Sequence, residues 1–177
     1  MKQQYIAFLR GINISGKNKL SMTELKIVMM TAGFTEVKTV LNSGNVIFRS
    51  KEGEHAKELQ KLIAEHFGLA IPVFVIKKEC LAELVAKAPS WWGKGGELYD
   101  NLIFVMNGLS TLEASEQLGP LSEGLERAAI ESAGIFWSFS LKNHQRCNWW
   151  QKSATLPIKD YLTIRTAKTV AKVLKEG

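Results

Sequence analysis

Strand-sized apolar runs and helix-like apolar patterns follow one another in the same order twice along the 177 residues. Short runs bounded by Gly, Asn and Pro predict strands, and apolar residues spaced by three or four predict helices. The elements expected in the first half are a strand at Tyr5–Leu9, a helix between Ser21 and Gly33, strands at Val37–Leu41 and Val46–Phe48, a helix at Glu54–Phe67 and a strand at Ile71–Ile76. This βαββαβ order is that of the ferredoxin-like fold. Tyr5–Leu9 is apolar on both faces, which favours a central strand, and Pro72 favours an edge strand.

The second half repeats this order of elements without residue-level identity to the first. The elements expected there are a linking helix at Glu79–Lys87, a loop at Pro89–Asp100, a strand at Leu102–Met106, a helix opened by Ser110, strands at Ala128–Glu131 and Ile135–Ser140, a helix near Asn143–Ser153, a strand at Tyr161–Ile164 and a last helix from Thr166. We therefore expect an α+β protein with two ferredoxin-like (βαββαβ) subdomains, residues 1–77 and 78–177, packed together, plus a C-terminal helix. Halves of this size have small cores, so we expect the five tryptophans to fill a shared interface.

Nothing in the sequence indicates a membrane segment or a metal site. No stretch reaches the roughly 18 apolar residues that a membrane span needs. The N-terminal Met-Lys-Gln-Gln runs directly into a strand, unlike a signal peptide, so we expect a soluble cytoplasmic protein with no membrane partner. Cys80 and Cys147 lack the spacing of metal ligands. His144 and Cys147 have a ligand-like gap, but one such pair falls short of the about four ligands of a zinc site.

The two ends of the chain are basic and the middle is not. Residues 1–50 carry 7 Lys and Arg against 2 Asp and Glu, and residues 141–177 carry 8 against 2, in a chain of net charge +6. If the two ends meet in space, they form a positive surface that favours nucleic acid or phosphorylated metabolites. The alternative is a net charge that serves solubility and has no partner.

Several segments are similar to a known family. They read Tyr5-Ile-Ala-Phe-Leu-Arg-Gly-Ile-Asn13, Gly16-Lys17, Gly33-Phe34, Leu41-Asn-Ser-Gly-Asn-Val-Ile-Phe48, Trp91-Trp92-Gly93 and Ile164-Arg165 followed by Thr169-Val170. They resemble domain-of-unknown-function family 1697 over nearly the whole chain. The resemblance implies a bacterial-type protein with two ferredoxin-like subdomains and brings no activity with it. The family's end motif usually continues Arg-Asn-Trp-Asn-Thr, whereas here it reads Arg165-Thr166-Ala167-Lys168-Thr169, so a site that needed that motif is altered.

The segment Gly11-Ile-Asn-Ile-Ser-Gly16-Lys17-Asn18 matches the first part of a phosphate-binding P-loop. The match then fails, because Asn18 stands where Ser or Thr should bind magnesium. The following helix also begins late, at the cap residue Ser21, whereas a P-loop helix begins at the Gly-Lys pair. We therefore do not assign a P-loop, but a strand, a glycine-containing loop and a helix N-terminus still make a generic cradle for an anion.

A second loop, Asn42-Ser43-Gly44-Asn45, is expected beside the first. The first and third strands of a ferredoxin-like sheet are antiparallel neighbours, so the end of Tyr5–Leu9 meets Asn45. The ligand-binding residues predicted from the two loops are Arg10, Gly11, Asn13, Gly16, Lys17, Asn42, Ser43, Gly44 and Asn45. The alternative is structural, since these glycines can supply positive φ and these Asn and Ser side chains can stabilise turns.

The sequence contains no assignable Ser-His-Asp or Cys-His set, so it identifies neither a catalytic residue nor a cofactor. The leading prediction is a protein that binds an anionic, phosphate- or nucleotide-like small molecule at the two loops. One alternative is an enzyme that acts on a phosphorylated small molecule at the same loops. The other is a nucleic-acid-binding protein that uses its basic N- and C-terminal segments. The first and third strands lack the Gly- and aromatic-rich pattern of an RNA-recognition motif.

Overall fold

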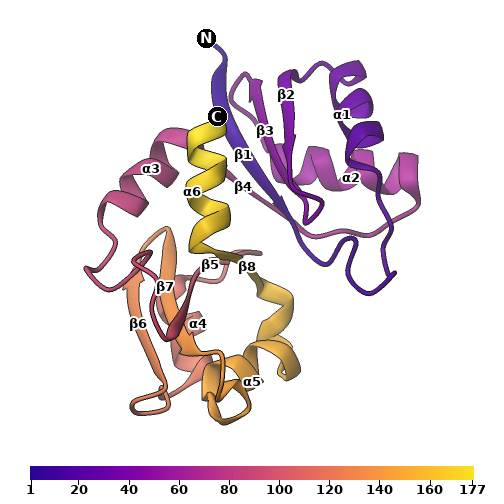
Figure 1. Cartoon of the computed structure of the whole chain (residues 1–177). Helices are drawn as coiled ribbons and strands as arrows, with labels where there is room; N and C mark the ends of the chain where they lie inside the picture. The colour runs from indigo at the N-terminus through magenta and orange to yellow at the C-terminus, as the bar shows by residue number, and fades with distance from the viewer. The chain divides into compact units, whose positions relative to one another are not determined.

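The computed structural model describes residues 1–177 and divides into two compact units. The first unit comprises Met1–Leu81 with Lys172–Gly177, and the second comprises Ala82–Ala171. Each unit holds one four-stranded sheet with its own helices (Figure 1). The helix α3 (Lys78–Ala86) carries the chain from the first unit into the second. No helix combines the length and hydrophobicity that crossing a membrane requires.

The first unit has the predicted order of elements. They are β1 (Gln3–Leu9), α1 (Met22–Thr31), β2 (Thr35–Val40), β3 (Asn45–Ser50), α2 (His55–Phe67) and β4 (Val73–Lys77). The sheet order is β2-β3-β1-β4, and every neighbouring pair is antiparallel. The fully apolar strand β1 is therefore central, and β4, which follows Pro72, is an edge strand.

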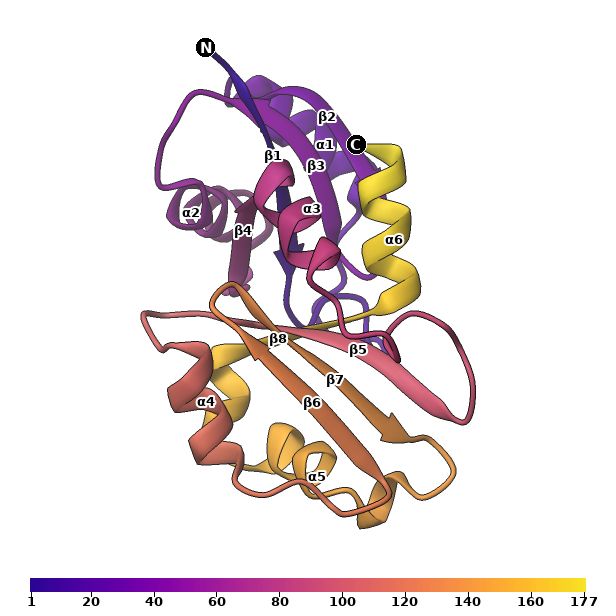
Figure 2. The ribbon, with the colours of Figure 1, turned by 90° about the vertical axis from the view of Figure 1, so that its left-hand side faces the viewer.

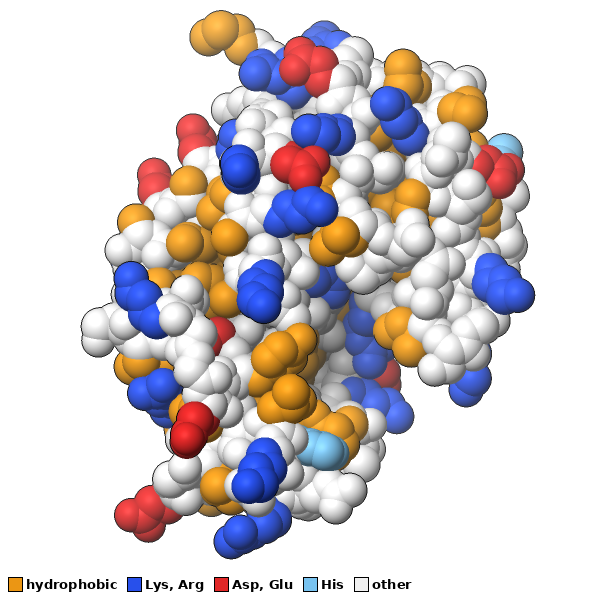
Figure 3. Space-filling model, viewed as in Figure 1, with side chains coloured by type: hydrophobic (Ala, Val, Ile, Leu, Met, Phe, Trp, Pro, Cys, Tyr) orange, Lys and Arg blue, Asp and Glu red, His pale blue; other side chains and the backbone are white.

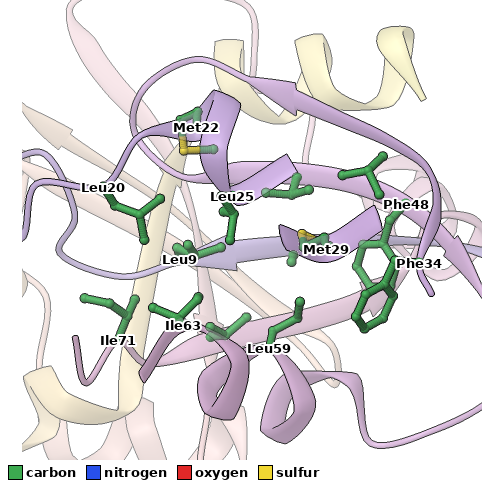
Figure 4. Close-up of a cluster of buried hydrophobic side chains, with 14 of the residues drawn as sticks. Leu9, Leu20, Met22, Leu25, Met29, Phe34, Phe48, Leu59, Ile63 and Ile71 are labelled. Carbon is green, nitrogen blue, oxygen red and sulfur yellow. The ribbon is translucent and has the colours of Figure 1, made fainter. Parts of the chain in front are cut away.

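The core of the first unit lies between its sheet and its two long helices. Leu25 and Met29 of α1 and Leu59 and Ile63 of α2 are buried in one cluster with Phe48 of β3 (Figure 4). Both helices therefore cover the same face of the sheet, and their apolar stripes explain why, because burial of such side chains drives packing.

Helix α1 ends as its flanking residues predict. The Ser21 hydroxyl accepts a hydrogen bond from the Glu24 backbone N–H at 3.2 Å. At the other end, Gly33 has a φ of +98°, and the Phe34 N–H donates to the Met29 carbonyl at 3.1 Å. These contacts supply partners for backbone groups that a helix end leaves without any.

The second unit repeats the arrangement. Its elements are β5 (Leu98–Val105), α4 (Thr111–Leu118), β6 (Glu126–Glu131), β7 (Gly134–Ser140), a 3₁₀ turn (His144–Arg146), α5 (Asn148–Thr155), a second 3₁₀ turn (Pro157–Tyr161) and β8 (Leu162–Thr166). The last helix, α6 (Ala167–Glu176), begins in the second unit, and its residues from Lys172 onward belong to the first. The sheet order β6-β7-β5-β8 is again fully antiparallel, with α4 and α5 packed on one face (Figure 2). The predicted α+β class with two ferredoxin-like arrangements and a C-terminal helix is confirmed.

The single helix expected at Asn143–Ser153 is wrong in detail, because the chain is extended at Cys147 and α5 begins after it. A buried carboxylate from another element fixes this start. Glu126 of β6 accepts hydrogen bonds from the Trp149 N–H at 3.0 Å and the Trp150 N–H at 3.4 Å. A negative group at a helix N-terminus is favourable. Glu126 is thus a capping residue for α5.

Two of the tryptophans, Trp137 and Trp149, have a role that differs from the expected one. Trp137 and Trp149 are buried in the second unit's own core, with ring centroids 6.4 Å apart. Trp92 is buried too, and its ring meets that of Phe136 edge to face at 5.0 Å. Trp137 and Trp149 therefore stabilise this unit from within.

Candidate functional site

The end of β1 and the turn between β2 and β3 lie side by side, as the strand register predicts. Phe8 is the register partner of Asn45, and the Leu9 N–H donates to the Gly44 carbonyl at 2.7 Å. The loop that follows β1 therefore starts against the hairpin turn. We call the segments Arg10–Lys19 and Asn42–Asn45 the joined loops.

Asn13 holds the joined loops together. Its side-chain amide donates to the Asn42 carbonyl at 2.9 Å and to the Leu20 carbonyl at 3.0 Å. Its side-chain oxygen accepts from the Leu20 N–H at 2.9 Å. The residue has a φ of +53°, a left-handed conformation that Asn tolerates better than most residues. This set of bonds gives Asn13 a positioning role.

Other polar residues of the joined loops are engaged in the same way. The Asn18 amide donates to the Gly11 carbonyl at 2.9 Å, which closes the first loop on itself. The Asn45 amide is buried and donates to the Val40 carbonyl at 2.8 Å and the Ser43 hydroxyl at 3.1 Å. These side chains shape the loops, as the structural alternative supposed.

A shallow depression of about 500 Å³ lies on the joined loops. Of the residues predicted for ligand binding, Asn13, Gly16 and Asn42 line it. The rest of its lining comes from the start of α1 and the residues before it: Lys19, Leu20, Ser21, Met22 and Thr23. Arg10, Gly11 and Lys17 lie on the same loop but outside this lining.

The P-loop comparison fails in the structure for the reason seen in the sequence. Gly16 and Lys17 belong to a tight turn in which the Lys17 N–H donates to the Ile14 carbonyl at 2.9 Å, and α1 starts only at Met22. The N-terminus of α1 nevertheless opens onto the depression. The first N–H groups of a helix lack intrahelical acceptors, and they carry partial positive charge.

The net charge of the protein resides in the first unit. That unit contains 14 Lys and Arg against 8 Asp and Glu, a balance of +6, whereas the second unit contains 9 of each. Many of these cations pair with neighbouring carboxylates, as Arg49 does with Glu36 at 3.0 Å. In Figure 3 the blue lysine and arginine side chains are scattered among acidic and hydrophobic ones on the face shown. Lys17 and Lys19 are exposed on the joined loops and form no ion pair.

The structure holds no cluster of side chains of the kind that binds a metal ion. No three His, Cys, Asp or Glu side chains lie close enough together to hold a metal ion. Cys147 is fully buried, and this burial, followed by the nearby Glu126 carboxylate, raises the pKa of its thiol above the ordinary value. Cys147 therefore has the environment of a structural cysteine and not of a nucleophile.

The family model for "Protein of unknown function (DUF1697)" matches residues 1–136. This segment is more than three quarters of the 177-residue chain. The chain belongs to the DUF1697 family. The altered segment Thr166-Ala167-Lys168 lies beyond the matched residues.

A solved structure supports the fold of this DUF1697 protein. It is described as "conserved bacterial protein SP0830 from Streptococcus pneumoniae" and is 26% identical, with a TM-score of 0.86. The similarity covers 99% of this chain and 98% of that chain. A search of curated proteins found no match.

Sequence reasoning did not find a second cavity of this DUF1697 protein. A pocket of about 730 Å³ lies within the second unit, where the end of α3, the glycine-containing loop Trp92–Gly96, the start of β5 and the junction of β8 with α6 converge. The signal in the sequence was the cluster Gly93, Gly95 and Gly96 beside two tryptophans. The lining residues of β8 and α6 are about 70 residues further along the chain, so only the fold brings them beside these glycines.

Proposed function

We propose that this protein binds a small anionic ligand with a phosphate group at the joined loops. The depression beside Lys19 carries the proposal, because it brings a cationic side chain and the N-terminus of α1 to one place on a unit of charge +6, with Asn13 holding the loops in position. A phosphate placed there would meet an ammonium group and backbone N–H donors together.

Each predicted residue has a distinct part in this proposal. Lys19 would contact the anion from the lining, and Lys17 and Arg10 would raise the local positive potential. Asn13, Asn42, Ser43, Gly44 and Asn45 would hold the two loops in register, and Gly11 and Gly16 would supply the positive φ of 70° and 76° that the first loop requires.

An enzyme that acts on a phosphorylated molecule at these loops is the alternative of a different class. General acid–base catalysis needs a titratable group within hydrogen-bond reach of the bound substrate. Lys19 is the one titratable side chain in the lining of the depression, and no Asp, Glu, His or Cys lies there to work with it. This favours binding over catalysis at this place.

Nucleic-acid binding is the other alternative, and the concentration of net charge in the first unit is the observation that favours it. The pairing of cations such as Lys38, Lys57 and Lys77 with carboxylates counts against it, since these cations are partly neutralised. A steep loss of binding with added salt would be its signature.

Thermal unfolding with inorganic pyrophosphate tests the proposal. A ligand at 100 times its dissociation constant stabilises the folded state by about 2.7 kcal/mol, so we expect a concentration-dependent rise of the midpoint in the parent protein. Lys19→Glu should weaken pyrophosphate binding by at least about tenfold, because it places a negative charge beside the anion.

The matched control is Lys61→Glu on α2, which makes the same change of charge in the same unit. Lys61 is exposed and 3.7 Å from Glu65, a surface pair of small energetic value. The control should retain the full midpoint shift. No shift in the parent, or an equal loss in both variants, would refute binding at the depression.

A further inference from the structure

We propose a second binding site in the cavity of the second unit, which takes a small aromatic molecule that carries one anionic group. The cavity measures about 730 Å³ and is lined by residues of the second unit alone. That volume lies within the range typical of small-molecule sites. The proposal is independent of the joined loops, which belong to the first unit.

One wall of the cavity is apolar and rigid. It is formed by Val85 in the last turn of α3, by Ala88 and Pro89 after that helix, and by Trp92. The Trp92 indole N–H donates to the Asn101 carbonyl at 2.7 Å, and its ring packs edge to face on Phe136. A fixed indole beside aliphatic side chains favours a flat aromatic ring, since stacked or edge-on rings gain energy beyond the area they bury.

Part of the cavity is lined by glycine backbone without side chains. Gly93, Gly95 and Gly96 have φ of 75°, 74° and 124°, and a Cβ at any of them would meet no atom within 4 Å. The Gly93 N–H is engaged, because it donates to the Asp100 carboxylate at 2.9 Å. These three glycines therefore add no side chain to the lining.

Two cations line this cavity, and its lining holds no free carboxylate. Lys94 and Lys168 are exposed lining residues without an ion pair. The one acidic lining residue, Asp100, is only 8% exposed, and its carboxylate already accepts from Gly93 and from the Ser138 hydroxyl. A negative group on the ligand would therefore be attracted to the end of the cavity where Lys168 opens α6.

The charge of the second unit points to a small ligand rather than a polymer. With 9 basic and 9 acidic residues, the unit has no net field to attract a nucleic acid. A ligand with one aromatic ring and one anionic group matches this lining, which holds Trp92 with aliphatic side chains and the two lysines.

The test uses 8-anilinonaphthalene-1-sulfonate, an aromatic sulfonate that fluoresces when bound, and protein labelled with ¹⁵N-glycine. The 14 glycines of the chain report both proposed sites in one spectrum. We expect this probe to shift the amide signals of Gly93, Gly95 and Gly96 and to leave those of Gly11 and Gly16 in place. Pyrophosphate, the probe of the joined loops, should do the reverse, so either proposal can fail without the other.

Charge variants and an uncharged probe complete the test. Lys168→Glu should weaken sulfonate binding by about tenfold, while Lys142→Glu, an exposed lysine outside the lining, should leave it unchanged. Lys168→Glu should stay folded, because a carboxylate in the first turn suits the N-terminus of α6.

An uncharged probe tests the role of the anionic group. N-phenyl-1-naphthylamine, which lacks the sulfonate, should bind to the parent more weakly than the sulfonate probe does, and it should bind equally to both variants. Fluorescence without movement of the three glycine signals, or equal affinity for the two probes, would overturn the proposal.

Discussion

Gly44 sits at the point where the joined loops meet, and replacing it with alanine tests how closely they are packed. Its φ is +86°, and a Cβ built there would lie 2.8 Å from the Leu9 Cβ and 2.8 Å from the Ile12 Cδ1. The left-handed conformation costs an L-residue about 1–2 kcal/mol. Overpacking a tight site costs about 1–3 kcal/mol more. We therefore expect Gly44→Ala to destabilise the first unit by about 2–5 kcal/mol.

Gly16→Ala is the matched control. Gly16 has a φ of +76°, but a Cβ there would meet nothing within 4 Å. Gly16→Ala should therefore destabilise the first unit only by the cost of the left-handed conformation, about 1–2 kcal/mol. The difference between the variants isolates the contact of Gly44 with β1 and the first loop.

Hydrogen exchange of the β1 and β3 amides is the suitable assay, because it reports the free energy of local opening. Tryptophan fluorescence is not suitable, since all five tryptophans lie in the second unit. A difference of about 1–3 kcal/mol between the variants means opening constants that differ by about 5- to 150-fold. Equal protection in the two variants would refute the close approach of the hairpin turn to Leu9 and Ile12.

Two further predictions concern the second unit and α3. Cys147 is buried and the pKa of its thiol is raised, whereas Cys80 is half-buried. The thiol reagent 5,5′-dithiobis(2-nitrobenzoate) should therefore modify Cys80 in the native protein and Cys147 only after unfolding. Modification of a native Cys80→Ser variant would contradict this. Hydrogen bonds from the Ser110 hydroxyl and backbone N–H lower the pKa of Glu113, so the ionised carboxylate stabilises α4 at neutral pH and this contribution is lost as the pH falls through the folded-state pKa. Ser110→Ala should move the NMR-measured pKa of Glu113 up toward its ordinary value and cost about 1 kcal/mol at neutral pH; an unchanged pKa would show that the capping contact is absent in solution.

The place of the joined loops followed from the sequence, but their internal bonding did not. Antiparallel pairing of the first and third strands was enough to bring Asn45 to the end of β1. That Asn13 bonds to Asn42 depends on the path of the first loop, in which Asn13, Ser15 and Asn18 all have positive φ. No local pattern specifies such a path.

The sequence by itself determined the order of elements and the ends of several helices. Hydrophobic periodicity and capping residues such as Ser21, Gly33 and Ser110 act over a few residues, so they can be read without the rest of the chain. The tertiary structure alone decided that Val173 is buried on α6, and that Glu126 caps a helix about 20 residues away. It also decided that the segments around Trp92 and Lys168 line one cavity. The physical reason is that burial and long-range hydrogen bonds depend on which elements pack together, and local sequence constrains that packing only weakly.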